Sequence, residues 1–522
     1  MRIYLMILAS MASYVLHAQK IKVSWSEESK KEMEYGSLVQ GSGLEMVKLS
    51  FETEGGMFSR KTVTPILSRY DNKLQEQDMK SFTVDQEGMK FDNLLSIKNN
   101  LFLFTNHYNR KEKTTTFYSQ KIDNKSLKPV GKPANLGAME AISRNSQSTV
   151  QYEVSKDSSK IMVFGLSPYA KKGNEKYYMA VYSHEMNKLW DNTVVLPYRD
   201  KFIDVLDYIV TNNGSVGVIL KHYDKEVKRE NVREDGARVP AYKTKLLLYA
   251  NGESQPKEFV MNLQDKYVHT MQVTADKNNN LTLFGLYKNK YDGYVSGYFV
   301  TVIDQKSMGV DVKKMEAFPA DLLELVKKDK QGSDREKDPG LSSYFTLADV
   351  VEREDGSIDY LLEYYKLVWR TRRSGNYSYS YPDYYYGDII DIRVSASAPT
   401  SFVRLPKWQH TANTSLYSSF KAVCHNNKLV IFYNDDRDNV ERDLAKKPDD
   451  MVKFDKSVLA MATIDQKNNL TRSVVYNHRD MKLTTCINAS KRLSTSKIGL
   501  YALKGAGVFS AAKDMVGLLE VN

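Results

Sequence analysis

The side chains that most often carry out chemistry in proteins are few and scattered in this sequence. Seven histidines follow the N-terminal segment, namely His107, His184, His222, His269, His410, His425 and His478. None is paired with another ligand at the spacing that zinc and iron sites use. The sequence therefore predicts neither a catalytic metal centre nor a bound cofactor.

Two cysteines are present, Cys424 and Cys486. Cys424 stands next to His425, but neighbouring residues of a strand point to opposite faces, so we do not interpret the pair as a nucleophile and its base. The two cysteines fall at similar positions of successive predicted strands. This placement leaves a disulfide between Cys424 and Cys486 open.

One acidic segment gathers oxygen donors of the kind that bind Ca²⁺. It contains Asp435, Asp436 and Asp438. The segment lacks the spacing and the glycine of an EF-hand loop, and Arg437 opposes a cation. These carboxylates are a metal candidate without a recognised motif.

The most unusual segment, from Asn376 to Gly387, is rich in tyrosine. Its tyrosines are Tyr377, Tyr379, Tyr381, Tyr384, Tyr385 and Tyr386, and they follow Arg370, Arg372 and Arg373. Tyrosine supplies a large contact area at low entropic cost, while serine and glycine let the backbone adapt. We predict that these residues bind a ligand or partner. The alternative is a hairpin extension whose tyrosines pack on neighbouring repeats.

A recurring hairpin would position these residues. Its clearest copy has an alternating apolar strand at 91–97, a polar turn at 98–100 and an apolar strand at 101–104. Six further copies span 150–164, 205–220, 268–286, 345–362, 420–432 and, less clearly, 483–503. A second hairpin with a polar turn follows, most literally at 121–127, 302–308 and 463–470.

With the strands of both hairpins named A to D, the repeating unit is roughly 60 residues long. The chain starts with a C–D hairpin near 62–82 and finishes with an A–B hairpin near 483–503, so the two ends would complete one unit. This phase predicts an all-β ring of about seven four-stranded blades, closed by the N-terminal C–D and the C-terminal A–B strands. Six or eight blades, or tandem β-sandwiches, are the alternatives.

In this architecture, residues 45–522 resemble β-propeller proteins. The chain has no Gly-His with Trp-Asp pair and no paired-glycine kelch pattern, so the resemblance implies a fold and no function. We expect residues 19–44 to form an N-terminal extension. A short helical insertion is predicted near 319–331, where apolar residues follow Pro319.

The first 18 residues predict a signal peptide. Arg2 precedes an apolar run, and Leu16-His17-Ala18 precedes the polar Gln19. The short start and the new terminal glutamine resemble exported proteins of Bacteroidota. No later apolar run is long enough to span a bilayer, which predicts a periplasmic or extracellular protein.

The formal charge of +11 is dispersed, because lysine and arginine alternate with acidic residues nearly everywhere. This distribution is typical of a solvated surface, and we expect no nucleic-acid partner. The sequence does not indicate an oligomeric state.

The longest predicted connections lie between strands B and C, and therefore on one rim of the ring. They are 105–116, 165–176, 223–243, 288–296, 370–388 and 434–456. Long loops on a rigid scaffold often carry binding residues. We predict a binding or scaffold module that uses this rim to hold a protein or glycan partner of the cell envelope.

Two other functions stay open. One is an exported carbohydrate-active enzyme with its site at the channel mouth, for which Asp92, Asp207 and Asp349 lie in or beside inner strands. The other is a structural subunit of a cell-envelope complex.

Overall fold

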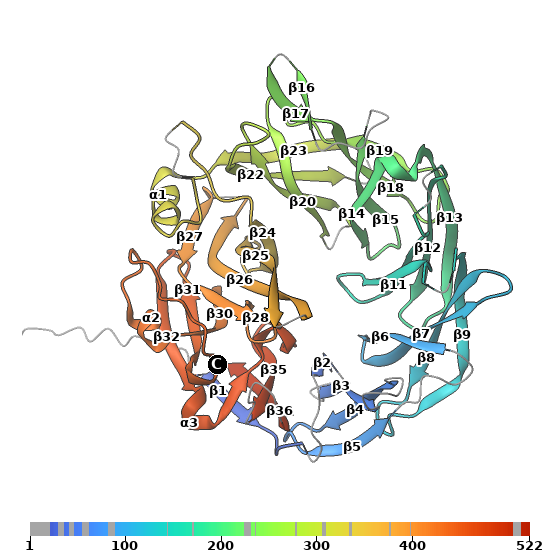
Figure 1. Ribbon diagram of the computed structural model, residues 1–522, viewed down its shortest axis with the longest axis horizontal. Helices are drawn as coiled ribbons and strands as arrows, with labels where there is room; N and C mark the ends of the chain where they lie inside the picture. Colours follow the sequence, from blue (N-terminus) through green and yellow to red (C-terminus); the bar gives the residue numbers. More distant parts are fainter. Residues whose placement is uncertain are drawn as a thin grey trace, which may run out of the picture.

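The computed structural model describes most of the chain after residue 20. The described residues are 21–522 without 30–35, 41–45, 55–61, 82–88, 144, 170–171, 224–230, 235, 277–278, 305–308, 334–336, 375–376, 397 and 505–512. The predicted signal peptide, residues 1–18, lies outside them. Antiparallel strands dominate the described part and form a ring (Figure 1).

Eight sheets of four or five strands make up this ring within the described residues. In seven of them the strand order follows the chain, so each is an antiparallel meander from an inner to an outer strand. This architecture is a β-propeller. The ring has eight blades, one of the two alternatives to the predicted number of about seven. We number the blades in chain order.

Blades 1 to 4 contain the strands of the first half of the chain. Blade 1 has β2 (Gly36–Gln40), β3 (Met46–Glu54), β4 (Thr62–Tyr70) and β5 (Glu76–Ser81); blade 2 has β6 (Met89–Ile97), β7 (Asn100–Asn109), β8 (Thr114–Ile122) and β9 (Pro129–Glu140). Blade 3 has β10 (Thr149–Val154), β11 (Lys160–Leu166), β12 (Asn174–Ser183) and β13 (Lys188–Arg199); blade 4 has β14 (Ile203–Val210), β15 (Val216–Tyr223), β18 (Tyr242–Tyr249) and β19 (Lys257–Val260).

Blades 5 to 8 complete the ring. Blade 5 has β20 (Tyr267–Ala275), β21 (Leu281–Lys288), β22 (Val295–Asp304) and β23 (Gly309–Ala317); blade 6 has β24 (Phe345–Glu352), β25 (Ile358–Ser374), β26 (Tyr377–Val394), β27 (Ser401–Leu405) and β28 (Gln409–Ala412). Blade 7 has β29 (Phe420–His425), β30 (Lys428–Asp435), β31 (Val458–Ile464) and β32 (Leu470–Asn477); blade 8 has β33 (Leu483–Thr485), β34 (Lys491–Arg492), β35 (Lys497–Lys504), β36 (Lys513–Val521) and β1 (Ile21–Trp25).

The ring closes differently from the prediction. The strands near 62–82 pair with β3 inside blade 1, and the chain closes instead where β1 becomes the outer strand of blade 8, with Ile21 opposite Val521. Residues 19–44, predicted to be an extension, therefore contain two propeller strands, β1 and β2. Both are only five residues long, which made their pattern too short to detect.

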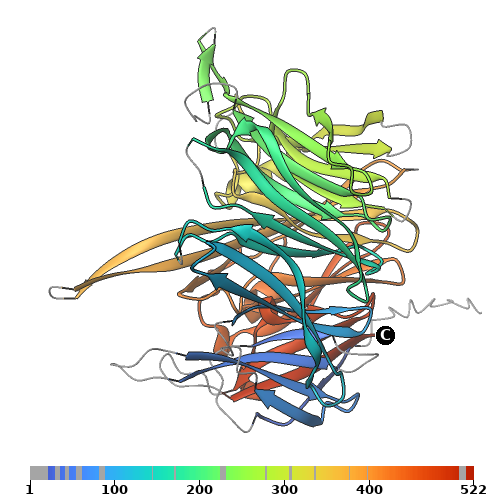
Figure 2. The same cartoon turned by 90° about the vertical axis from the view of Figure 1, so that its right-hand side faces the viewer.

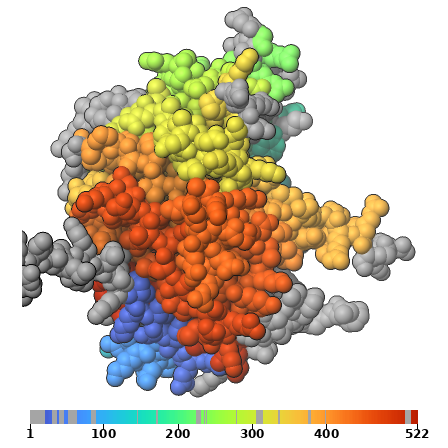
Figure 3. Space-filling view, turned by 90° about the vertical axis from the view of Figure 1, so that its left-hand side faces the viewer, coloured from blue at the N-terminus to red at the C-terminus, as the bar shows by residue number. Residues whose placement is uncertain are grey.

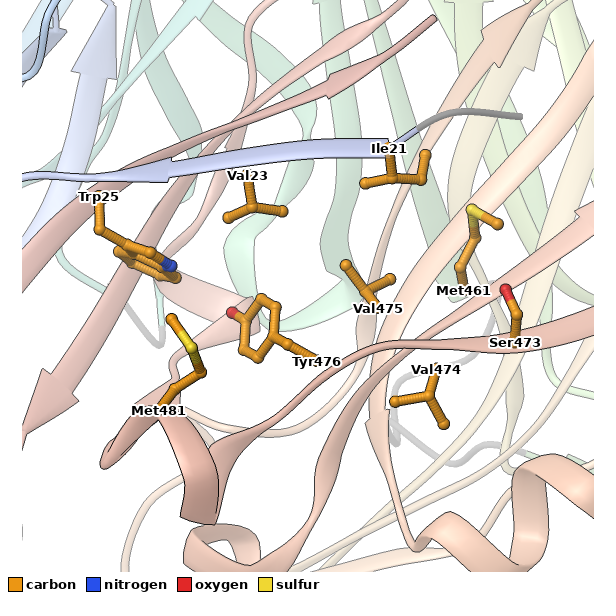
Figure 4. A pocket seen from close by; sticks show the side chains of 9 residues that line it. All are labelled: Ile21, Val23, Trp25, Met461, Ser473, Val474, Val475, Tyr476 and Met481. Carbon is orange, nitrogen blue, oxygen red and sulfur yellow. The ribbon is translucent and has the colours of Figure 1, made fainter. Parts of the chain in front are cut away.

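Side chains of the closing strand pack against blade 7. Ile21, Val23 and Trp25 of β1 face Val475 and Tyr476 of β32 across a hollow of about 390 Å³ (Figure 4). The ring of Trp25 meets that of Tyr476 edge-on, with 6.1 Å between centroids. Apolar contacts thus hold the closing strand in addition to its ladder with β36.

The hydrophobic core is divided among the gaps between adjacent blades. Phe164 of blade 3 stacks on Tyr208 of blade 4 at 4.7 Å, and Phe284 of blade 5 stacks on Tyr360 of blade 6 at 4.1 Å. The second strand of a blade is buried on both faces, as in the apolar run of β11. The outer strand β13 alternates buried and exposed residues, because one face meets solvent.

The connections between second and third strands carry most of the added structure. They include the ribbon β16 (Asn231–Glu234) and β17 (Ala237–Pro240), the helix α2 (Arg437–Glu441) and the long hairpin of β25 and β26. Helix α1 (Ala320–Lys328) lies between blades 5 and 6, and α3 (His478–Met481) precedes blade 8. Among the described residues, no helix is long and apolar enough to cross a bilayer.

Candidate functional site

The inner strands carry the carboxylates that the enzyme hypothesis invoked. A β-bulge interrupts four inner strands at a corresponding place, just before Asn93, Asp207, Thr270 and Asp349. At three of these places the side chain, that of Asn93, Asp207 or Asp349, accepts a hydrogen bond from the backbone N–H of the next residue, at 2.8, 2.9 and 2.8 Å. Since a bulge disturbs the ladder, these side-chain oxygens have a structural role in restoring lost hydrogen bonds.

The carboxylates of Asp92, Asp207 and Asp349 also connect blades. Asp92 accepts from the Tyr152 hydroxyl at 2.8 Å, Asp207 from the Val273 backbone N–H at 3.0 Å, and Asp349 from Arg492 Nη2 at 2.8 Å. Burial raises the pKa of Asp92 and of Asp207, and the hydrogen bonds partly oppose this rise. Each of the three carboxylates is therefore engaged by another blade: Asp92 and Asp207 by the next blade, and Asp349 by blade 8, two blades further on.

A cavity of about 680 Å³ occupies the channel at the end where the inner strands turn back. Glu153, Asp276, Glu352, Lys156 and Arg492 are its charged lining residues. Lys156 Nζ lies 2.6 Å from Glu352 Oε2 and joins blade 3 to blade 6. Burial, with a smaller contribution from Asp207, raises the pKa of Glu153 to about 7. The cavity is thus of mixed charge.

The tyrosine-rich segment is a projecting ribbon of two long strands. Pairing with β24 ends at Tyr364, and pairing with β28 ends at Asp383, whereas β25 and β26 continue to pair as far as Ser374 and Tyr377. Figures 2 and 3 show this hairpin standing out from the ring. We call residues 366–382 the arm.

The register divides the arm into two faces, because successive strand residues point to opposite sides. On one face Trp369 lies opposite Pro382, and Leu367 points to the same side. Trp369 is 66% exposed and Leu367 is 40% exposed. Near the base of the arm this face is apolar and open to solvent, whereas further out it carries Thr371 and Arg373.

The other face alternates arginine and tyrosine. Arg370 is opposite Tyr381, and Arg372 is opposite Tyr379. Tyr379 is 51% exposed, and its ring centroid lies 6.0 Å from that of Tyr381. The arm therefore offers two chemically different surfaces.

Polar and aromatic contacts fix the base of the arm. Arg370 forms an ion pair with Asp383 and donates to the Tyr385 hydroxyl at 2.9 Å. The Tyr385 ring stacks on His410 of β28 at 4.4 Å with nearly parallel planes. These contacts hold the base of the arm against the blade.

The structure thus separates the predicted binding residues. Tyr379, Tyr381, Arg372 and Arg373 lie on the arm, whereas Tyr384 and Tyr385 lie at its base and Tyr386 is buried against Tyr365. Tyr377 begins β26, and nothing is described of its side chain. Trp369 and Leu367 were not predicted as binding residues, although their position among Lys366, Arg370 and Arg372 indicates an exposed strand.

The disulfide that the sequence left open is not formed in the structure, where Cys424 and Cys486 are both free and buried. Cys424 packs in the core between blades 6 and 7, and Cys486 packs in the core between blades 8 and 1. Similar positions along inner strands do not bring two side chains together when the side chains face different gaps. Burial raises the pKa of both thiols.

The acidic segment at the end of β30 caps a helix. Asp436 is the N-cap of α2 and accepts from the Asp438 backbone N–H at 3.0 Å. Asp435 points into the core, where its Oδ1 accepts from Asn439 Nδ2 at 2.9 Å. Within the part of the chain that the structure describes, no group of three or more His, Cys, Asp or Glu is placed to hold a metal ion.

Comparisons with known proteins agree with the propeller architecture and assign no family. No family model matches the sequence, and no curated protein matches it. The chain is similar in structure to the polysaccharide lyase Uly1 at 9% identity and a TM-score of 0.41, over 95% of this chain and 92% of the lyase.

Two further solved structures are similar. The β-propeller domain of the Trilobed protease from Pyrococcus furiosus is 10% identical with a TM-score of 0.36, over 86% of this chain and 98% of that domain. The WD40 domain of SCAP from fission yeast is 9% identical with a TM-score of 0.36, over 96% and 94%. At these values the likeness concerns architecture alone.

Proposed function

We propose that this propeller is an exported binding module that holds a protein partner through the arm of blade 6. The observation that carries the proposal is the exposure of Trp369 and Tyr379 on a ribbon that projects from a rigid ring. Large aromatic side chains contribute strongly to binding when a partner buries them. Packing within the ring does not account for their exposed positions.

The backbone and the charge of the arm support the same proposal. Beyond Tyr365 and Pro382, no further strand pairs with β25 or β26 among the described residues, so both edges offer free N–H and C=O groups. Residues 366–382 contain Lys366, Arg370, Arg372 and Arg373 and no acidic residue. This charge favours a partner with an acidic surface.

The proposed location is the periplasm or the extracellular space. It is supported by the signal-like segment of residues 1–18, which precedes the closing strand β1. A mature chain that starts near Gln19 retains all of β1 and hence the complete eighth blade. An envelope complex in which this module is one subunit is compatible with the same arm.

Photocrosslinking in cells that naturally produce the protein tests the proposal. A benzophenone amino acid at Tyr379 or at Trp369 is expected to give a discrete adduct, whose partner mass spectrometry then identifies. Val195 of the outer strand β13 is the control, because it is 58% exposed and lies away from the arm. Adducts of equal yield from position 195, or none from the arm, would overturn the proposal.

Substitution of the same side chains provides the complementary measurement. The double variant Trp369→Ser/Tyr379→Ser is expected to lose the adduct formed from a benzophenone at position 381. Because both side chains are exposed, the free energy of unfolding should change by less than about 0.5 kcal/mol. Retained capture by a folded double variant would contradict a binding role of the arm.

A further inference from the structure

A second channel cavity, of about 430 Å³, lies where the inner strands of blades 6, 7 and 8 meet. Its lining includes Asp349 of β24, Lys421 of β29, and Lys491 and Arg492 of β34. Ser419, Asn488 and Ser490 complete the polar part of the wall. The cavity is therefore bounded by three cationic side chains and one carboxylate.

Arg492 is already engaged by the protein. It donates to Asp349 Oδ1 at 2.8 Å and to the Ala422 carbonyl at 3.2 Å. The guanidinium and the carboxylate neutralise each other. The charge of the cavity is therefore that of Lys421 and Lys491.

Neither lysine amine has an ion pair or a hydrogen bond within the described residues. Lys421 lies within electrostatic range of Asp349 and Glu363. Glu363 already accepts hydrogen bonds from Lys407 Nζ at 2.6 Å and from the Ser419 hydroxyl at 2.7 Å. Burial lowers the pKa of Lys421 and of Lys491. Two half-buried amines thus share one cavity, and its one carboxylate, Asp349, is already bonded to Arg492.

An unpaired cation away from bulk water is costly, and a bound anion removes this cost. We propose that this cavity binds a small molecule that carries a carboxylate, sulfate or phosphate group, with Lys421 and Lys491 as its charged donors. The volume lies within the range of small-molecule sites. Arg492 also lines the 680 Å³ cavity, so the uncharged part of a longer ligand has room beside the anionic group.

Calorimetric titration of the purified chain tests this site, with inorganic phosphate, sulfate and succinate as separate probes. Ionic strength is held constant with chloride. At least one probe is expected to bind saturably to the natural chain, and Lys421→Gln/Lys491→Gln should weaken that binding at least tenfold. The control Lys446→Gln/Lys456→Gln removes the same charge from exposed positions of blade 7 and should bind normally.

Two results would overturn the proposal: no saturable binding of any probe to the natural chain, or equal weakening in both double variants. A second measurement does not require the variants to fold. After reductive methylation with ¹³C, the resonances of Lys421, Lys491 and Lys288 should titrate at a lower pH than those of exposed lysines, because burial lowers all three pKa values. Only those of Lys421 and Lys491 should move to higher pH with the bound probe. Lysine resonances that do not respond to any probe would also contradict the site.

Discussion

Two sets of charged side chains at the central channel differ in whether the fold supplies a hydrogen-bond partner: the carboxylates Asp92, Asp207 and Asp349, and the lysines Lys421 and Lys491. Asp92, Asp207 and Asp349 each accept a hydrogen bond from another blade. Lys421 and Lys491 have no partner among the described residues. A polar group that the fold satisfies holds the structure together, whereas one that it leaves unsatisfied is available to a molecule from outside. The comparison predicts that removal of the two kinds of side chain has opposite effects on stability.

Glu153 gives the largest expected effect and the hardest test of this comparison, because it is a channel carboxylate with no hydrogen-bond partner in the described part of the chain. Burial raises its pKa from an ordinary 4.5 to about 7. The folded state thus favours the protonated form, and the stabilisation present below pH 4.5 is lost as the pH rises through 7. Relative to Glu153→Gln, the free energy of unfolding should fall by up to roughly 3 kcal/mol over this range.

Urea denaturation of both proteins between pH 4 and pH 8 provides the measurement. If the natural chain and Glu153→Gln show parallel pH profiles, Glu153 titrates normally and is satisfied like the other carboxylates.

Asp207→Ala should lower the free energy of unfolding by about 2 kcal/mol, since it leaves the N–H groups of Val273 and Tyr208 without an acceptor. Asp207→Asn keeps one side-chain oxygen and is expected to lose less. The measurement is urea denaturation at pH 7. An alanine variant as stable as the natural chain would show that the contact between blades 4 and 5 does not depend on this carboxylate.

Tyr152→Phe should cost about 1 kcal/mol, because it removes the hydroxyl that donates to Asp92 while it keeps the ring. The tilted contact of the ring with Phe104, at 4.3 Å, is retained in the variant. Thermal unfolding followed by circular dichroism detects the change. A rise in Tm would show that the hydrogen bond from Tyr152 does not stabilise the fold and that Asp92 behaves like Lys421 and Lys491.

Lys491→Met should give the smallest effect and one of opposite sign. Without any added anion, removal of the half-buried amine is expected to raise the free energy of unfolding by about 0.5 kcal/mol. The same urea assay, in chloride buffer, measures it, with Lys456→Met as the exposed control. A clear loss of stability would mean that Lys491 belongs to the scaffold.

The repeated hairpins could be predicted because each one is local in sequence. Turns such as Lys98-Asn99-Asn100 lie between apolar strands, and the structure has a hairpin there, with positive φ at Lys98 and Asn99. The closing strand could not be predicted in this way. Its partner lies at the opposite end of the chain, and a run of five residues such as Ile21–Trp25 is too short to define a period.

The same holds for the candidate sites: residues that are contiguous in the sequence could be predicted, whereas residues that meet only in the fold could not. The tyrosine-rich hairpin was visible because its residues are contiguous, although the division into two faces required the register of β25 and β26. Lys421 and Lys491 were not found, because they become neighbours only when β29 and β34 of successive blades meet at the channel. Because each lysine comes from a different blade, no local segment of the sequence is enriched in lysine and points to the site.

The use of β1 as the outer strand of blade 8 has a consequence for synthesis of the chain. The first propeller strand to be synthesised, β1, cannot pair until the last strand, β36, has been made, because Ile21 pairs with Val521. Contacts between such distant residues form slowly, and an unpaired strand edge is prone to aggregate in the meantime. Biogenesis of this protein should therefore depend on chaperones that protect the N-terminal strand until translation is complete.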